Sequence, residues 1–133
     1  MLLKISQHGQ RLAVRLLFRP SFTVALVLGT LLALIDGAEA VTGNANDRML
    51  HAAGFAGLAF LLDYSCPAPA AAYWRWQLPA LLLYGILIEV IQGFLPHRLA
   101  DLYDAAADLA GLLAYGAMRP LLARIWRPRW LPT

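Results

Sequence analysis

The chain has 133 residues, of which 60% are hydrophobic and 14% are charged, and its formal net charge is +3. An average soluble domain is about 45–50% apolar and about 25% charged, so this composition favours a single membrane domain. The one cysteine, Cys66, excludes an internal disulfide.

Four segments are apolar and long enough for membrane helices, each of which needs roughly 20 mostly apolar residues to cross a bilayer. In chain order they are 20–40, 49–66, 78–95 and 102–126. Prolines lie near several boundaries, where helices commonly begin or end, and 66–72 is expected to be a linker. The predicted fold is an all-α integral membrane bundle of about four transmembrane helices. Residues 1–19 would form a basic N-terminal segment, 20–126 the transmembrane domain and 127–133 a basic tail.

The basic residues predict an orientation, because Lys and Arg mark cytoplasmic loops. Eight of the eleven lie before the first predicted span or in and after the last one, and Arg75 lies between the second and third. Both termini are therefore expected in the cytoplasm. Topology accounts for the positive charge, so nucleic-acid binding is not expected.

The first predicted span has a rival interpretation as a cleaved signal peptide. Ala38, Glu39 and Ala40 resemble a small-residue cleavage site after an apolar core. However, about 20 residues before that core is long for a signal peptide. Cleavage would leave three spans and an external N-terminus, so a membrane span is the preferred interpretation.

Small residues recur in the second and fourth predicted spans at spacings that let helices approach closely. They are Gly54 with Gly57, and Gly111 with Gly116. Glycine is also common in membrane helices generally, so helix contacts at these positions are one of two interpretations.

Polar residues of three predicted spans repeat at helical spacing near the outer end of the bundle. Within each stripe they lie three or four residues apart, which places them on one helix face. The stripes are Asp47 with His51, Glu89 with Gln92, and Asp101 with Asp104 and Asp108. Apolar residues fill most other positions, so the stripes are expected to face one another. Among the acidic residues only Asp63 falls on the cytoplasmic side, where a capping or interfacial role is expected.

Glu89 lies roughly 9 Å from the end of its predicted span, at 1.5 Å per residue. A charge at the membrane centre costs about 2.5–3.5 kcal/mol on insertion scales, so this carboxylate must be protonated, paired or hydrated. Arg98 and His51 are its expected partners, since an arginine can hold a carboxylate with two parallel hydrogen bonds.

The polar residues resemble three motifs of the VanZ-like family of small polytopic bacterial membrane proteins. Asp47, Arg48 and His51 resemble the first motif, Glu89 with Gln92 the second, and Pro96, His97 and Arg98 followed by Asp101, Asp104, Asp108 and Gly111 the third. The resemblance covers about 47–115. Arg48 stands where lysine is usual, and Asp108 stands where asparagine is common. The family is named after a protein linked to teicoplanin resistance, which implies a setting in the bacterial inner (plasma) membrane but no agreed reaction.

Ionisable residues inside a membrane are candidates for function. The candidate ligand-binding residues are Asp47, Arg48, His51, Glu89, Gln92, Arg98, Asp101, Asp104 and Asp108. The preferred hypothesis is that they bind the polar or anionic headgroup of an envelope lipid or glycolipid, with the basic groups meeting the anion.

Two alternatives remain open. The first is an intramembrane enzyme, in which His51 with Asp47 acts as a general base, or His51 and carboxylates hold a divalent metal. The second is a purely structural cluster that fixes helix packing. The sequence identifies no cofactor and no ligand. A unit of this size could form a homo-oligomer, although no stripe requires one.

Overall fold

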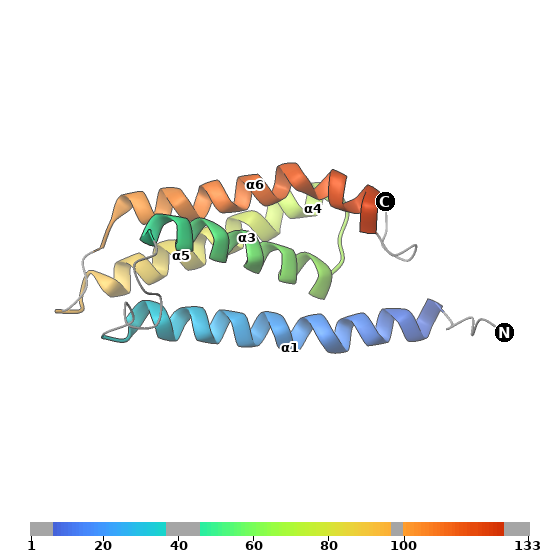
Figure 1. The fold of residues 1–133 in the computed structure, drawn as a ribbon, viewed down its shortest axis with the longest axis horizontal. Helices are drawn as coiled ribbons and strands as arrows, with labels where there is room; N and C mark the ends of the chain where they lie inside the picture. The colour runs from blue at the N-terminus through green and yellow to red at the C-terminus, as the bar shows by residue number, and fades with distance from the viewer. Residues whose placement is uncertain (1–6, 37–45, 97–99, 127–133) are drawn as a thin grey trace.

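The computed structural model of the chain describes residues 7–36, 46–96 and 100–126. These residues form helices and connections, with no strand among them. The helices are α1 (Gln7–Leu34), α3 (Asp47–Ser65), α4 (Ala70–Ala72), the π-helical turn η1 (Tyr73–Gln77), α5 (Leu78–Gln92) and α6 (Leu102–Trp126). Because α4, η1 and α5 follow one another without a break, the described chain forms four long helical segments (Figure 1). The all-α prediction is confirmed.

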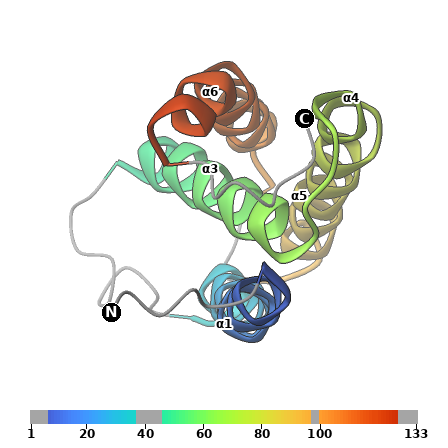
Figure 2. The same ribbon diagram turned by 90° about the vertical axis from the view of Figure 1, so that its right-hand side faces the viewer.

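The four segments pack in a ring that is clearest when viewed along the bundle (Figure 2). Helix α3 contacts α1 on one side and α6 on the other, and α5 contacts both α6 and α1. The chain reverses direction at each connection, so α3 and α6 begin at the end of the bundle where α1 and α5 finish (Figure 1). We call this the cluster end, because the polar stripes lie there.

Helix α1 begins earlier than predicted and runs through Pro20, which was expected to mark a boundary. A proline removes one backbone donor from a helix, and nearby serine and threonine side chains can compensate for the loss. Here the freed carbonyl is that of Leu16, whereas Ser21 donates to the Leu17 carbonyl at 2.8 Å and Thr23 donates to the Arg19 carbonyl at 3.0 Å, so these two bonds do not replace the lost one. The predicted end of this span and the alternative cleavage site, 38–40, lie outside the described residues.

The linker predicted at 66–72 is shorter in the structure, because helix resumes at Ala70. Three consecutive alanines, the strongest helix formers, follow the last proline of the linker and extend the third segment backwards. The buried Tyr73 of η1 then donates its hydroxyl to the Leu112 carbonyl of α6 at 2.6 Å. This bond ties the start of the segment to the last helix.

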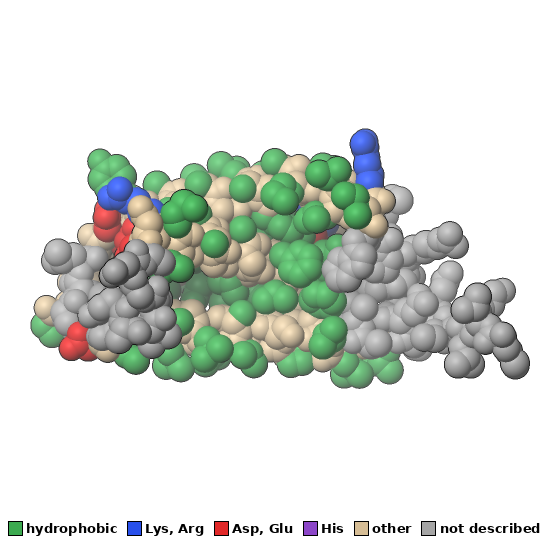
Figure 3. All heavy atoms as spheres, in the orientation of Figure 1, with side chains coloured by type: hydrophobic (Ala, Val, Ile, Leu, Met, Phe, Trp, Pro, Cys, Tyr) green, Lys and Arg blue, Asp and Glu red, His purple; other side chains and the backbone are tan. Residues whose placement is uncertain are grey.

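Large apolar side chains lie mainly on the outside of the bundle. A small core of buried residues includes Phe55, Leu81 and Leu112, whereas most large apolar residues of α1 are exposed. Hydrophobic side chains are spread over the middle of the visible face, and acidic side chains appear mainly at its left-hand end (Figure 3). Two described segments, Arg15–Leu34 and Ala70–Gln92, are long and apolar enough to cross a membrane. The other two expected spans form α3 and α6, and stay predictions as membrane spans.

Two glycines let the helices approach closely near the polar stripes. A β-carbon on Gly111 of α6 would overlap the backbone of Ala52 on α3. A β-carbon on Gly85 of α5 would overlap Asp108 Oδ2 and the Phe55 ring. By contrast, Gly54 has no neighbour within 4 Å. Of the two interpretations left open by the sequence, close helix contact therefore holds at Gly111 and does not hold at Gly54.

Candidate functional site

His51 lies at the centre of the polar residues at the cluster end. Its Nδ1 atom is 2.8 Å from Asp108 Oδ1, and its Nε2 atom is 3.9 Å from Asp104 Oδ2. Asp104 and Asp108 are one helical turn apart on α6, so both can face the histidine on α3. Asp108 is only 1% exposed, and Gly85 of α5 makes room for it, because a β-carbon there would overlap Asp108 Oδ2.

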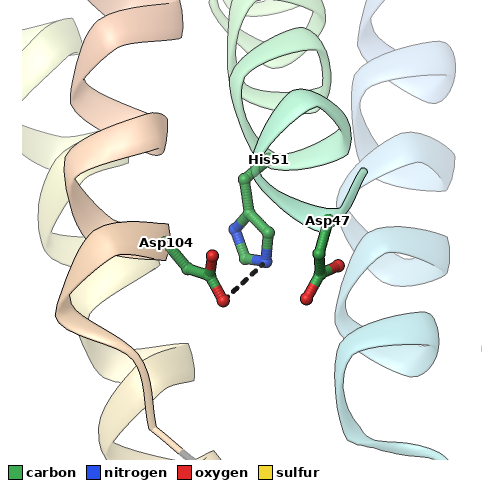
Figure 4. Close-up of side chains that lie close together, drawn as sticks. All are labelled: Asp47, His51 and Asp104. Atoms are coloured by element: carbon green, nitrogen blue, oxygen red, sulfur yellow. Dashed lines mark ion pairs between the residues drawn. The ribbon is translucent and has the colours of Figure 1, made fainter. Parts of the chain in front are cut away.

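Asp47 completes this group from the solvent side. It lies one turn before His51 on α3, and its carboxylate flanks the imidazole on the side of Nε2 (Figure 4). One ligand atom each from Asp47, His51 and Asp104 can be chosen so that all three lie within 4.8 Å of one another. Two helices thus bring an imidazole nitrogen and two carboxylates to one point.

Arg48 and Asp101 form the rim of the site. Arg48 Nη2 lies 3.6 Å from Asp101 Oδ2, and the guanidinium also stacks over the Tyr103 ring at 4.8 Å. Both partners of the ion pair are substantially exposed, so its contribution to stability is small, at about 0–1 kcal/mol. The pair is free to exchange for contacts with a ligand.

Glu89 reaches the site from α5. Its Oε2 atom accepts a hydrogen bond from the Asp101 backbone N–H at 2.9 Å, just before α6 begins. Its Oε1 atom is buried and has no hydrogen-bond partner among the described residues. The expected pairing of Glu89 with His51 is not formed, because the imidazole faces Asp104 and Asp108 instead. Arg98, the other expected partner, lies outside the described residues.

Gln92 does not join the group formed by the other candidates. Its side-chain amide donates to the Ala33 carbonyl of α1 at 2.8 Å, so it ties α5 to α1. The structure therefore brings Asp47, His51, Glu89, Asp104 and Asp108 together, places Arg48 and Asp101 at the rim, and gives Gln92 a packing role.

Carboxylates outnumber basic groups among the described members of the site. The acidic side chains are five, namely those of Asp47, Glu89, Asp101, Asp104 and Asp108, and the basic ones are His51 and Arg48. Arg48 is itself paired with Asp101. Carboxylates accept hydrogen bonds and attract cations. The described residues thus suit a group that brings hydroxyls, an ammonium or a metal ion, and Arg48 is the described group suited to an anion.

A second buried polar group at the opposite end was missed by sequence reasoning. Asp63 Oδ2 accepts from Arg119 Nε at 2.6 Å and from the Tyr115 hydroxyl at 2.8 Å, and Asp63 Oδ1 accepts from Arg119 Nη2 at 2.8 Å. The same guanidinium donates to the Ala68 carbonyl at 2.7 Å. The capping or interfacial role expected for Asp63 was wrong, because it forms a buried ion pair between α3 and α6. Both carboxylate oxygens of Asp63 accept hydrogen bonds, so we interpret this buried group as structural.

Comparison of the chain with protein-family models, with curated proteins and with solved structures finds no match. The class that the fold itself defines is an all-α bundle with two segments that could cross a membrane. The resemblance of its motifs to the VanZ-like family stays a prediction.

Proposed function

We propose that this chain is a VanZ-like, multi-pass protein of the bacterial inner (plasma) membrane with both termini in the cytoplasm. Its four helical segments would cross the bilayer and place the cluster end toward the outside. There the polar site would bind the headgroup of an envelope lipid or glycolipid. The observation that carries this proposal is the inverted polarity of the bundle, in which charged groups lie between helices and large apolar side chains lie outside.

The exposed apolar surface supports a lipid environment. Leu16, Leu17 and Leu28 of α1, Leu87 of α5 and Leu121 of α6 are each more than half exposed. Soluble monomers rarely expose apolar patches larger than a few hundred Å², because such surface is unfavourable in water. A bilayer removes this cost.

The buried charges support a ligand site at the cluster end. Glu89 is 7% exposed and Asp108 is 1% exposed, and burial of a carboxylate costs several kcal/mol unless it is well paired. The rim formed by Arg48 and Asp101 is exposed, so a headgroup could reach the inner carboxylates from the end of the bundle. Hydroxyls or an amine of a sugar would donate to those carboxylates, and an anionic part would meet Arg48.

Native mass spectrometry of the gently extracted protein tests this proposal. Wild type is expected to retain an envelope lipid, and Asp104→Asn and Arg98→Ala are expected to lose it. Asp36→Asn is the matched control, because Asp36 is an exposed acid near the end of α1. Equal lipid occupancy in all four proteins, or a bare wild type, would contradict a headgroup site.

A further inference from the structure

The three side chains that meet at the cluster end have the arrangement of metal ligands. Two ligands about 2.1 Å from a tetrahedral ion lie about 3.4 Å apart. His51 Nε2 and Asp104 Oδ2 are 3.9 Å apart, and one ligand atom each from Asp47, His51 and Asp104 can be chosen so that all three lie within 4.8 Å of one another. A small rotation of exposed Asp47 and a closure of about half an ångström would bring all three to ligand distance.

The imidazole is held in the orientation that a metal ligand needs. Metal-binding histidines commonly donate their second ring N–H to a carboxylate, which fixes the tautomer and raises the basicity of the ligating nitrogen. An ionised Asp108 accepts such a bond from His51 Nδ1 at 2.8 Å. The lone pair of Nε2 is then directed toward Asp104, on the side where Asp47 also lies (Figure 4). A cation, or a proton on Nε2, would remove the repulsion between this lone pair and the two carboxylates.

The buried carboxylate of Glu89 is a second, independent observation that points to a ligand at this site. Its Oε1 atom is buried and has no hydrogen-bond donor among the described residues, although its other oxygen is bonded to the Asp101 N–H. The bond from the Asp101 N–H places the carboxylate beside the start of α6, three residues before Asp104. A water bound to a metal ion is a strong donor and would satisfy this oxygen.

We propose that Asp47, His51 and Asp104 bind one divalent transition-metal ion, with Asp108 orienting His51 and Glu89 accepting a hydrogen bond from metal-bound water. One imidazole and two carboxylates suit Zn²⁺, Mn²⁺ or Fe²⁺, whereas an all-oxygen site would suit Mg²⁺ or Ca²⁺. Arg48 lies at the rim in an exposed ion pair with Asp101 and is not one of the three groups that would hold the ion. Three protein ligands leave at least one position open for water or another ligand. This ion site does not depend on the proposed headgroup binding.

The test is calorimetric titration of Zn²⁺ into the full chain, without a histidine tag, in a neutral detergent free of added lipid. Wild type is expected to bind about one ion per chain. Asp104→Asn and Asp47→Asn are expected to bind at least about tenfold more weakly, and the control Asp36→Asn is expected to bind as wild type does. Far-UV circular dichroism and gel filtration of each variant check the fold.

Asp47→Asn keeps the test decisive if Asp104→Asn fails to fold, because Asp47 is exposed in the first turn of α3. No Zn²⁺ binding by wild type would overturn the metal site. Undiminished binding in the folded variants would also overturn it, since the ion would then be held by other groups such as His8 or Cys66. Because lipid plays no part in this titration, its result is separate from that of the lipid-retention experiment.

Discussion

Asp63 and Arg119 join α3 to α6 at the end of the bundle opposite His51, and their pairing predicts a large response to a single substitution. Asp63 accepts three side-chain hydrogen bonds, two from Arg119 and one from Tyr115. Both members of the ion pair are largely buried. Asp63→Ala would leave the guanidinium between the helices with the Ala68 carbonyl as its one acceptor among the described residues.

Removal of one partner from a buried ion pair typically costs about 3–5 kcal/mol, because an uncompensated charge remains. At about 1.4 kcal/mol per factor of ten, this lowers the folding equilibrium constant by about two to four orders of magnitude. By contrast, Asp63→Leu combined with Arg119→Met removes both charges. The double variant is expected to be more stable than Asp63→Ala, since an apolar pair avoids the desolvation cost.

The assay is unfolding by sodium dodecyl sulfate in mixed micelles, followed by far-UV circular dichroism. Asp36→Ala is the matched control at an exposed acid and is expected to change the free energy of unfolding by less than about 0.5 kcal/mol. If Asp63→Ala also stays within that range, or if the double variant loses as much as Asp63→Ala, the reasoning about a buried charge pair is refuted.

Two further predictions concern the cluster end. Gly111→Ala is expected to destabilise the bundle by about 1–3 kcal/mol, because its β-carbon meets backbone and α3 must move. Gly54→Ala, whose β-carbon meets nothing, is the control and should be neutral or stabilising in the same unfolding assay; equal losses in both would contradict the packing argument. Asp108→Ala is expected to weaken Zn²⁺ binding about 10–100-fold, because His51 loses the side chain that orients it; calorimetry measures the affinity, and an unchanged value would contradict the orienting role.

The apolar segments of the sequence predicted most helix positions, and the spacing of the polar residues predicted part of the candidate site. The spacing of Asp104 and Asp108 correctly placed both on one face of α6, and His51 does meet that face. Spacing gives the face of a helix but not the neighbour that this face meets. Gln92 shares its stripe with Glu89, yet its amide reaches a backbone carbonyl of α1.

The ion pair of Asp63 with Arg119 shows why other contacts could not be predicted. The two residues are 56 positions apart, and neither belongs to a repeating polar stripe. Only the close packing of α3 on α6 brings them together. Pro20 illustrates a different limit, because a proline inside a helix removes one N–H and frees one carbonyl, here that of Leu16, and helix α1 continues through this loss.

The central claim is that the chain spans the membrane with its cluster end outside, and cysteine labelling tests it most directly. Cys66 is the only cysteine and is exposed at the end opposite the cluster. Asn46→Cys in a Cys66→Ser chain places a thiol at an exposed position of the cluster end. A membrane-impermeant maleimide is expected to label Asn46→Cys in intact spheroplasts, and Cys66 only after lysis. Labelling of Cys66 before lysis, or of both positions alike, would contradict the account.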